Sequence, residues 1–496
     1  MVAPALPFLL FLSLISNSAS SPLQSHDEGF ISAVVSEKGL VFVKDLLVDQ
    51  AVKSLTPLRL PDIDKSVKIP LIGSVHVSIS NITLYRINVS SSTIRLGDAG
   101  IAIVASGANA SLSMQWRYSY STWVLVPIEL FDEGSAFVQV EGMEVDLTIR
   151  MENQGGALAL NATQCSCNME DMTIKLDGGA SWFYQGFVIA FDDHIRSAVE
   201  TAITKKITEG IRKLGSLLRA LPKEIDFGGI AALNVTFVDD PVIGNSSIGF
   251  DIDGLFVPSN SEIVSSYLYG ESHDLVYSVH CRDPSKMLGI SVDEAVFNSA
   301  SMVLFEEGLF HWIVDKVPDQ SLLNTASWKY IIPQLYRRYP NDEMQLNVSL
   351  ASHPSIKVTS KNIVAIVFSD VIIEVLDGDE AIPVACISVD FSVSGVAGIS
   401  KDNKIVSKAV LKDFSLTLKW SKIGNFHMFL VQGVMRIFLH TVVMPCLNSH
   451  LSKGFPVPVI RGLAIENAQI LTSSSTIVLC FDVAFANSGN FTDVSS

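Results

Sequence analysis

Residues 143–151 read Met-Glu-Val-Asp-Leu-Thr-Ile-Arg-Met, and residues 195–221 read Ile-Arg-Ser-Ala-Val-Glu-Thr-Ala-Ile-Thr-Lys-Lys-Ile-Thr-Glu-Gly-Ile-Arg-Lys-Leu-Gly-Ser-Leu-Leu-Arg-Ala-Leu. In the first stretch apolar and polar residues alternate, which predicts a β-strand with one dry and one wet face. In the second, apolar residues recur every three or four positions, which predicts a helix with an apolar stripe about 40 Å long. Pro222 follows and ends the helix. The two patterns predict a one-sided sheet packed against a long helix.

Both halves of the chain show this order of elements. Alternation also predicts strands over 75–80, 344–350, 387–393 and 414–420, typical of long, strongly curved antiparallel sheets. Periodicity predicts helices over 40–55, 291–309 and 426–451. Ser291 and Glu294 have the spacing of a capping box, and Pro445 is expected to kink the last helix. The space between such a helix and such a sheet is either an ordinary dry core or a groove that holds an acyl chain. The pattern of apolar residues does not distinguish these two interpretations.

The composition limits the class of protein. The 496 residues include 35 Lys+Arg and 51 Asp+Glu, a net charge of −16, and 48% are hydrophobic. This length corresponds to two or three domains. The high hydrophobic fraction excludes a disordered chain. The acidity argues against a nucleic-acid partner, because binding to phosphates requires positive charge.

The first residues predict export. Residues 1–20 combine a short apolar run with Ser18-Ala19-Ser20, which is typical of a cleavable signal peptide. A membrane anchor is the alternative, but the run is shorter than the about 20 residues that a span needs. Another apolar segment, 429–447, is interrupted by Gln432, Arg436 and His440, so we do not expect it to span a membrane. We expect a secreted, extracellular protein.

Two further features fit an exported protein. Sequons occur more often than the roughly three or four expected by chance, and each marks an exposed surface position. They lie at Asn81, Asn88, Asn109, Asn161, Asn234, Asn245, Asn347 and Asn490. The six cysteines permit disulfides, with 15 pairings open. They are Cys165, Cys167, Cys281, Cys386, Cys446 and Cys480.

A search for catalytic motifs favours a protein that is not an enzyme. The chain has no glycine-rich phosphate loop, no Gly-x-Ser-x-Gly elbow and no His-Glu-x-x-His helix. The acidic stretches at 251–254 and 376–380 are interpreted as turns, and 270–274 as a polar loop rather than a catalytic triad. Scattered histidines indicate no metal site, and no cofactor is expected. Paired carboxylates remain an alternative, since their separation is a three-dimensional quantity.

Residues 116–123, Trp-Arg-Tyr-Ser-Tyr-Ser-Thr-Trp, lie between strand-like stretches at 110–114 and 124–130 and are therefore expected to form a hairpin tip. Exposed aromatic residues with an arginine suit a membrane interface or a glycolipid. Alternatively, Trp116 and Trp123 flank the turn as a cross-strand pair.

Several stretches resemble the family of bactericidal/permeability-increasing protein and lipopolysaccharide-binding protein, related to cholesteryl ester transfer protein. The most specific is Lys-Gly-Phe-Pro-Val-Pro at 453–458. The others lie, in the family's order, at 35–40, 59–62, 66–69, 140–143, 165–167, 288–291, 297–299 and 421–426. The cysteine pattern and the loss of basic residues indicate a plant-type member.

The resemblance implies an α+β fold, an elongated boomerang of two similar barrels joined by a central sheet. Each barrel would be a highly curved antiparallel sheet wrapped around a long helix. The boundaries would be 28–221 for the first barrel, 222–262 for the linker and central sheet, 263–484 for the second barrel, and 485–496 for a polar tail. Family members hold phospholipid acyl chains in both barrels. The implied pocket walls include Val75, Val77, Ile79, Val389 and Phe391.

The resemblance also implies disulfides and a head-group site. Animal members bridge a strand cysteine to the long helix, but Thr204 occupies the helix position here. In the second half, Cys446 can bridge to Cys386 or Cys480. Lipopolysaccharide recognition in the family uses a lysine-rich tip, which here has one arginine and no lysine, so binding to anionic glycolipid should be weaker. The candidate residues are Arg59, Lys65, Lys68, Trp116, Arg117, Tyr118, Tyr120 and Trp123.

We therefore expect a secreted, monomeric lipid-binding protein. It would sequester acyl chains of lipopolysaccharide or related lipids, in innate defence against bacteria, with a bacterial or membrane surface as a further partner. A general phospholipid carrier is the alternative. An extracellular hydrolase is the distant alternative from another class.

Overall fold

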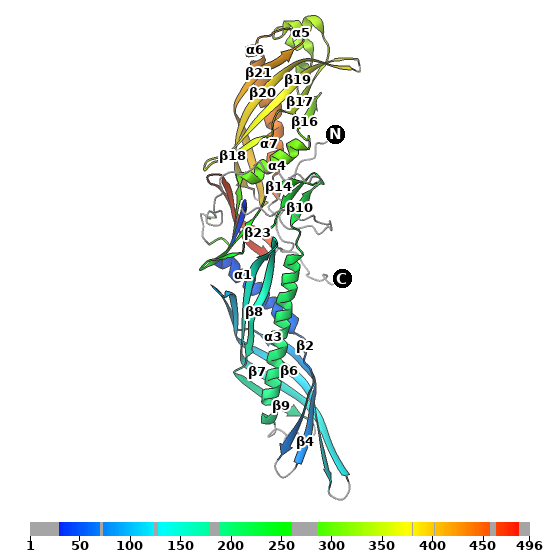
Figure 1. Cartoon of the computed structure of the whole chain (residues 1–496), viewed down its shortest axis with the longest axis vertical. Helices are drawn as coiled ribbons and strands as arrows, with labels where there is room; N and C mark the ends of the chain where they lie inside the picture. Colours follow the sequence, from blue (N-terminus) through cyan, green and yellow to red (C-terminus); the bar gives the residue numbers. More distant parts are fainter. Residues whose placement is uncertain are drawn as a thin grey trace. The chain divides into compact units, whose positions relative to one another are not determined.

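The computed structural model (Figure 1) describes residues 29–69, 73–123, 127–178, 188–259, 281, 285–378, 380–400, 402–456 and 463–485. The predicted signal peptide and residues 486–496 of the predicted tail lie outside the described residues. The chain divides into two compact units. The N-terminal unit comprises 35–221 and 240–249, and the C-terminal unit comprises 1–34, 222–239 and 250–496.

The N-terminal unit is built on an eight-stranded antiparallel sheet. The strand order is β2-β4-β6-β7-β8, with β3 paired to β4, β5 to β6 and β9 to β7. β6 and β7 are long, and shifts of register at Ala105 and Ala108 mark bulges, which bend a sheet. The strands are β2 (Leu58–Arg59), β3 (Ile63–Ile69), β4 (Gly73–Asn88), β5 (Ser91–Gly97), β6 (Gly100–Trp123), β7 (Pro127–Gln154), β8 (Ala157–Asn168) and β9 (Asp171–Asp177).

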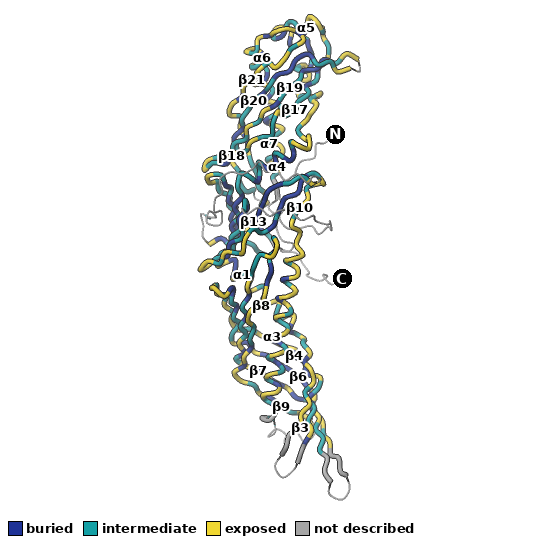
Figure 2. The backbone as a smooth tube through the Cα atoms, in the orientation of Figure 1, coloured by how far each residue is buried: buried dark blue, intermediate teal, exposed yellow. Residues whose placement is uncertain are grey.

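The described part of this unit contains two helices. α1 (Glu37–Leu55) confirms the helix predicted over 40–55, and α3 (Ile189–Arg219) confirms the long one. The predicted stripe of α3 packs along most of its length: Ile195, Val199, Ile203 and Ile211 are buried, and Leu214 and Leu218 are half-buried. Half-buried and exposed positions alternate along the helix (Figure 2). Gly215 lets α3 approach β8, because a Cβ there would lie 3.0 Å from the carbonyl oxygen of Leu160.

The C-terminal unit has a seven-stranded antiparallel sheet in the order β16-β17-β19-β20-β21-β22, with β18 paired to β19. The strands predicted over 344–350, 387–393 and 414–420 are confirmed as β17 and as parts of β20 and β21. The bounds are β16 (His311–Val314), β17 (Met344–Leu350), β18 (Ser355–Val358), β19 (Ile363–Asp377), β20 (Glu380–Ile399), β21 (Lys404–Ser421) and β22 (Phe455–Pro456).

The long helix of this unit is interrupted. α6 (Met428–Phe438) and α7 (Met444–Lys453) are joined by a π-helical turn, Leu439–Val443. Pro445 lies in the first turn of α7, and its missing N–H explains why the regular hydrogen-bond pattern breaks just before it. By length and composition Met428–Lys453 is apolar enough to cross a membrane, but one face of it is buried in the core, including Val431 and Leu439.

Shorter elements complete the C-terminal unit. α4 (Glu294–Glu306) is capped by Asp293, whose side chain accepts a hydrogen bond from the Ala295 N–H. The predicted capping box with Ser291 is therefore wrong. The Glu294 carboxylate instead accepts from the N–H of Val358, at 2.7 Å, because it lies beside β18. The remaining elements are η3 (Gln320–Leu323), η4 (Thr325–Trp328), α5 (Pro333–Arg338), β10 (Glu224–Phe227), β11 (Ala231–Asn234), β14 (Phe256–Pro258), β15 (Leu288–Asp293), β23 (Leu463–Thr472) and β24 (Thr476–Phe485).

The chain passes between the units at four points: after Leu221, before Asp240, and within the two strands β1 (Ile31–Ser36) and β13 (Ser247–Ile252). These strands belong to a six-stranded sheet whose other members are β12 (Val242–Ile243), β15, β24 and β23. The α+β fold class, with curved antiparallel sheets and a long helix in each unit, is confirmed.

One disulfide, Cys281–Cys480, is present in the described part of the chain, and it joins residues 199 positions apart. The predicted bridge from Cys446 is wrong, because Cys446 is exposed on α7 and Cys386 is buried on β20 without a disulfide partner. Cys165 is also free, and its sulfur lies 3.9 Å from the carbonyl oxygen of Thr204 on α3. The strand cysteine therefore faces the helix position at which animal relatives were expected to place a bridge.

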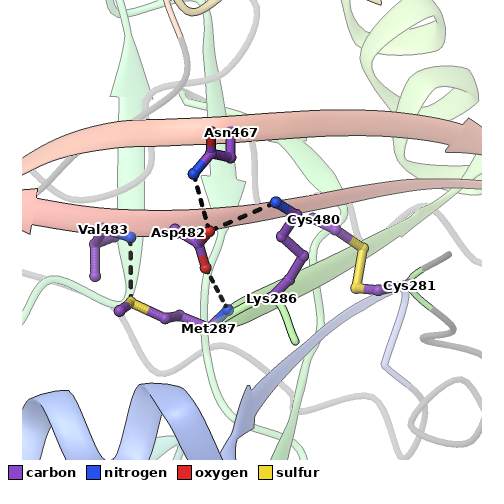
Figure 3. A network of polar contacts seen from close by, with 7 residues as sticks. All are labelled: Cys281, Lys286, Met287, Asn467, Cys480, Asp482 and Val483. Carbon is purple, nitrogen blue, oxygen red and sulfur yellow. Dashed lines mark hydrogen bonds and ion pairs between the residues drawn. A yellow bond between two sulfur atoms is a disulfide. The ribbon is translucent and has the colours of Figure 1, made fainter. Parts of the chain in front are cut away.

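Beside the disulfide lies a buried ion pair (Figure 3). The Asp482 carboxylate is 3.5 Å from the Lys286 ammonium, and both side chains are buried. It also accepts hydrogen bonds from the Met287 N–H at 3.1 Å and from the Asn467 amide at 3.2 Å. The carboxylate thus links β23, β24 and the segment that leads into β15 at one point.

We predict that Asp482→Ala lowers the free energy of unfolding of the C-terminal unit by about 3–5 kcal/mol, because the buried Lys286 ammonium, the Met287 N–H and the Asn467 amide all lose the carboxylate that they contact. Urea unfolding of the full chain measures this. Asp402→Ala, at an exposed acid of the same unit, is the control and should change stability by less than about 0.5 kcal/mol. Equal effects of the two variants would contradict the prediction.

The free thiols predict an order of chemical labelling. Burial raises the pKa of the Cys167 thiol to about 12, and burial together with the nearby Asp370 carboxylate raises the pKa of Cys386. Because thiolates are the reactive form, a maleimide should modify exposed Cys446 in the native protein and the other two only after unfolding. Peptide mapping by mass spectrometry reads the order, and native labelling of Cys167 before Cys446 would contradict it.

Candidate functional site

The interior of the N-terminal unit is an apolar core between α3 and the inner face of the sheet. Leu84, Leu112 and Val138 on the strands meet Val199 and Ile203 on the helix, and all five are buried. The predicted pocket-wall residues lie on the same face of β4. Val75 and Ile79 are buried, and Val77 is half-buried against the core.

The interior of the C-terminal unit contains a small cavity of about 30 Å³ between α6, the sheet and the η3–η4 turns. All eleven lining side chains are apolar, and they are Leu322, Leu323, Trp328, Leu346, Val371, Ile373, Ile387, Val431, Val434, Met435 and Phe438. Of the predicted wall residues, Val389 is buried and Phe391 half-buried in the surrounding core, but neither lines the cavity.

The cavity could not be predicted from the sequence, although one of its walls carries a signal that could have been found. The four α6 residues carry a readable signal, because Val431, Val434, Met435 and Phe438 follow helical spacing within the predicted 426–451 helix. Leu322, Leu323 and Trp328 lie in two short 3₁₀ turns, which have no periodicity to detect. The Trp328 indole N–H donates to the Leu322 carbonyl at 2.9 Å and fixes these turns to each other.

The cavity wall offers little for chemistry other than apolar contact. Its volume would hold one or two water molecules, but apolar cavities of this kind stay dry. The described residues also contain no group of three or more His, Cys, Asp and Glu side chains arranged to bind a metal ion. This arrangement suits a ligand whose buried part is hydrocarbon.

The predicted hairpin tip is corrected by the structure. β6 continues through residues 116–123 and β7 begins at Pro127, and residues 124–126 lie outside the described residues. Trp116 is only 6% exposed, and its indole N–H donates to the Ser135 carbonyl at 3.0 Å. Its register partner is Gly134, where a Cβ would lie 2.7 Å from the indole ring. Trp116 is therefore a core residue, and it does not pair with Trp123, whose partner is Pro127.

The other head-group candidates divide between two faces of the sheet. Lys65, Val77 and Tyr118 form one cross-strand row, and because Val77 and Tyr118 pack on the core, exposed Lys65 lies on the inner face. Arg117 lies on the outer face, 2.6 Å from the carboxylate of Glu133.

The remaining candidates take different positions. Arg59 is exposed opposite Thr83, next to the inward Leu58–Leu84 pair, and thus also on the outer face. Tyr120 is half-buried opposite Val75. Lys68 is in β3 opposite Ser74, but its side chain and that of Trp123 lie outside the described residues. The structure thus places Lys65 and Tyr118 in one cross-strand row, with Val77 between them, and separates them from both arginines.

The sequons are exposed with two exceptions among the described residues. Asn81, Asn88, Asn109, Asn161 and Asn245 are exposed. Asn347 is half-buried, and its amide donates to Glu374 at 3.3 Å. Asn234 is 2% exposed, and its side-chain oxygen accepts from the N–H and hydroxyl of Thr236, at 3.0 and 2.8 Å. The expectation that every sequon marks the surface is wrong for Asn234. Asn490 lies outside the described residues.

Comparison with known proteins agrees with this architecture over most of the chain. The model of the N-terminal domain of the LBP / BPI / CETP family matches residues 39–216, and that of its C-terminal domain matches residues 231–485. A putative BPI/LBP family protein of Arabidopsis thaliana is 50% identical over 468 residues, which cover 94% of this chain and 95% of the relative. The bactericidal permeability-increasing protein of Sebastes schlegelii is 25% identical over 460 residues, covering 90% and 93% of the two chains.

A solved structure extends the likeness to the fold. The crystal structure of lipopolysaccharide binding protein matches with a TM-score of 0.61 at 17% sequence identity, covering 93% of this chain and 100% of that chain. The family models, the relatives and the shared fold lead to one conclusion: this chain belongs to the LBP / BPI / CETP family.

Proposed function

We propose that this protein binds amphipathic lipids by taking their acyl chains into the apolar interiors of its units, with lipopolysaccharide or a related lipid as the ligand. The observation that carries the proposal is the cavity of the C-terminal unit, whose wall consists of apolar side chains. Each CH₂ group that leaves water for such an interior contributes about 0.8 kcal/mol. Relatives named for binding lipopolysaccharide support the ligand class.

Binding requires the cavity to open, because about 30 Å³ is too small for an acyl chain. We expect the η3–η4 turns to be the wall that moves, since these short turns contribute Leu322 and Trp328 and are joined to the start of β17 by an isolated bridge between Asn324 and Glu343 rather than by a continuous ladder. The sheet wall is held by continuous backbone ladders, such as the β19–β20 register from Ile363 to Asp377. We infer that the lipid enters by displacing these turns from α6.

For the N-terminal unit, Lys65 is the best-placed head-group residue. It is exposed on the inner face, in the row of Val77 and Tyr118, one row from buried Ile79 and Trp116. An acyl chain against this core would bring its phosphate to the Lys65 ammonium, with the Tyr118 ring beside the glycerol or sugar.

A general phospholipid carrier is the second candidate function. The observation that favours it is the pairing of Arg117 with Glu133, which removes a cation from anionic recognition in a chain of net charge −16. Members of the family bind lipids rather than turn over substrates, which supports a non-enzymatic role. Secretion, glycosylation at the exposed sequons and a role in defence belong to the proposal, because the disulfide and the named relatives are consistent with them.

Native mass spectrometry of the protein from a eukaryotic secretory host, followed by lipid extraction, tests the proposal. We expect two intact amphipathic lipids per chain, one for each unit. Competition with lipopolysaccharide then separates the two candidate functions, because a carrier without specificity retains its phospholipid. A chain free of lipid would contradict the proposal, and release of cleaved lipid products would indicate a hydrolase.

Filling the cavity should remove one lipid. In Val434→Phe the added ring occupies space beside Met435 and Phe438, so we expect one bound lipid fewer per chain, with a stability loss of about 1–3 kcal/mol. Val410→Phe makes the same change at an exposed position of β21 and should keep both lipids. Equal lipid content in the two variants would show that the cavity is not the acyl site.

The head-group role of Lys65 is tested by salt dependence. Lys65→Ala should weaken lipopolysaccharide binding several-fold at low ionic strength and flatten its dependence on salt, because one phosphate contact is lost. Arg117→Ala, on the opposite face of the same sheet, should leave both quantities unchanged. Isothermal titration over a salt series measures both variants. The reverse pattern would place the head group on the outer face.

A further inference from the structure

Two long stretches of this acidic protein contain no acidic residue. The chain has 51 Asp+Glu, yet none occurs from Gln320 to Asn341 or from Phe414 to Ile465. The first stretch carries Lys329, Arg337 and Arg338. The second carries Lys419, Lys422, Arg436, Lys453 and Arg461. Both stretches are therefore locally basic within a chain of net charge −16.

The structure joins parts of both stretches in the C-terminal unit. The Gln334 side chain donates to the Asn425 carbonyl at 3.1 Å, and the Arg338 guanidinium donates to the Lys422 carbonyl at 3.1 Å. Buried Leu335 and Phe426 pack in the same apolar cluster beneath these contacts. α5 and the start of α6 accordingly lie at the same end of the unit (Figure 1).

This end exposes large apolar side chains as well as cations. Phe429 is 83% exposed and Tyr330 is 80% exposed, and Leu430 and Trp420 are also exposed. The Lys329 ammonium lies 4.8 Å from the ring centre of Tyr330. We call the following residues the α5–α6 end: Lys329, Tyr330, Arg337, Arg338, Trp420, Lys422, Phe429 and Leu430.

Such a combination fits the surface of an anionic membrane. Lysine and arginine side chains bind the phosphates of anionic lipids. Aromatic rings that have an apolar body and a polar edge are favoured at the boundary between head groups and acyl chains. Charge complementarity supports this partner, because the α5–α6 end itself carries four exposed cations, Lys329, Arg337, Arg338 and Lys422, and no acid. The exposed acids Asp377 and Glu380 lie beside it, at the turn between β19 and β20. Gathered apolar side chains at a surface indicate an interaction site.

The path of α6 favours a membrane over an acidic protein. Its first turn carries exposed Phe429 and Leu430, and the same helix then contributes Val431, Val434 and Met435 to the cavity wall. If Phe429 inserts into a lipid layer, the α6 wall of the cavity lies next to a source of acyl chains. An acidic protein bound at the same place would supply no acyl chain to the cavity.

We propose that the α5–α6 end docks on the head-group layer of an anionic membrane, with Phe429 and Leu430 inserted and Lys329, Arg337 and Lys422 on the phosphates. This goes beyond the proposed function, since docking is a property of the outer surface. It requires no lipid inside the cavity.

Sedimentation of the full-length protein with vesicles tests the docking. We expect binding to phosphatidylcholine vesicles that contain about one quarter phosphatidylglycerol, and much weaker binding to pure phosphatidylcholine. Lys329→Glu with Arg337→Glu should weaken binding at least tenfold, because each cation near an anionic surface is worth roughly fivefold. Phe429→Ser should weaken it several-fold on the same vesicles.

Matched controls come from the same unit. Lys357→Glu with Lys361→Glu reverses the same number of exposed charges on and after β18, and Phe368→Ser removes an exposed ring of β19. Both controls should bind within about twofold of the unaltered protein, since few changes outside the contact alter affinity. Thermal unfolding of each variant confirms that it is folded.

Three results would overturn the docking proposal. They are no binding of the unaltered protein to anionic vesicles, equal loss in the control charge pair, and full binding by Phe429→Ser. Lipid content measured on the same samples keeps the two proposals apart. A protein that carries lipid but ignores vesicles refutes docking alone, and one that docks without carrying lipid refutes the proposed function alone. If the α5–α6 end binds an acidic protein but the unaltered protein does not bind vesicles, the first of these results is met and docking is refuted.

Discussion

The fold depends on one kind of contact, the burial of an apolar helix face against the inner face of a curved antiparallel sheet. In the N-terminal unit Ile195, Val199 and Ile203 of α3 supply that face, and in the C-terminal unit α6 supplies it with Val431 and Met435. Sheets flat over such lengths would leave part of the helix face in water. The bulges of β6 and β20 bend the strands, and glycine at 215 and 134 lets helix and indole approach the backbone closely.

The periodicity of apolar residues predicts the elements that bury one face and expose the other. The strand over 143–151 and the helix beginning near Ile195 could be predicted because each must present a dry face at a fixed repeat. The expected tip at 116–123 failed although the same signal was present. Leu112, Met114, Trp116 and Tyr118 alternate with polar residues, so the strand continues, whereas the expectation of a tip followed from the strand-like stretches on either side of the segment.

Contacts between distant segments could not be predicted in this way. Cys281 and Cys480 meet because β15 and β24 are neighbours in one sheet, and no local pattern encodes that neighbourhood. The same holds for the cavity wall formed by Leu322 and Trp328, and for the separation of Lys65 from Arg117. Lys65 lies in the same cross-strand row as Tyr118, the residue that follows Arg117, so the two cations point to opposite faces of the sheet.

The disulfide has a consequence for how the C-terminal unit is completed during synthesis. Cys281 emerges first, and its partner follows only after 199 more positions, a length that includes the whole seven-stranded sheet and the interrupted helix. The bond therefore cannot guide the early pairing of β17, β19 and β20. It can form only after Cys480 has been synthesised, when all seven strands of that sheet are already present in the chain, so its oxidation can stabilise the unit without directing the first strand pairing.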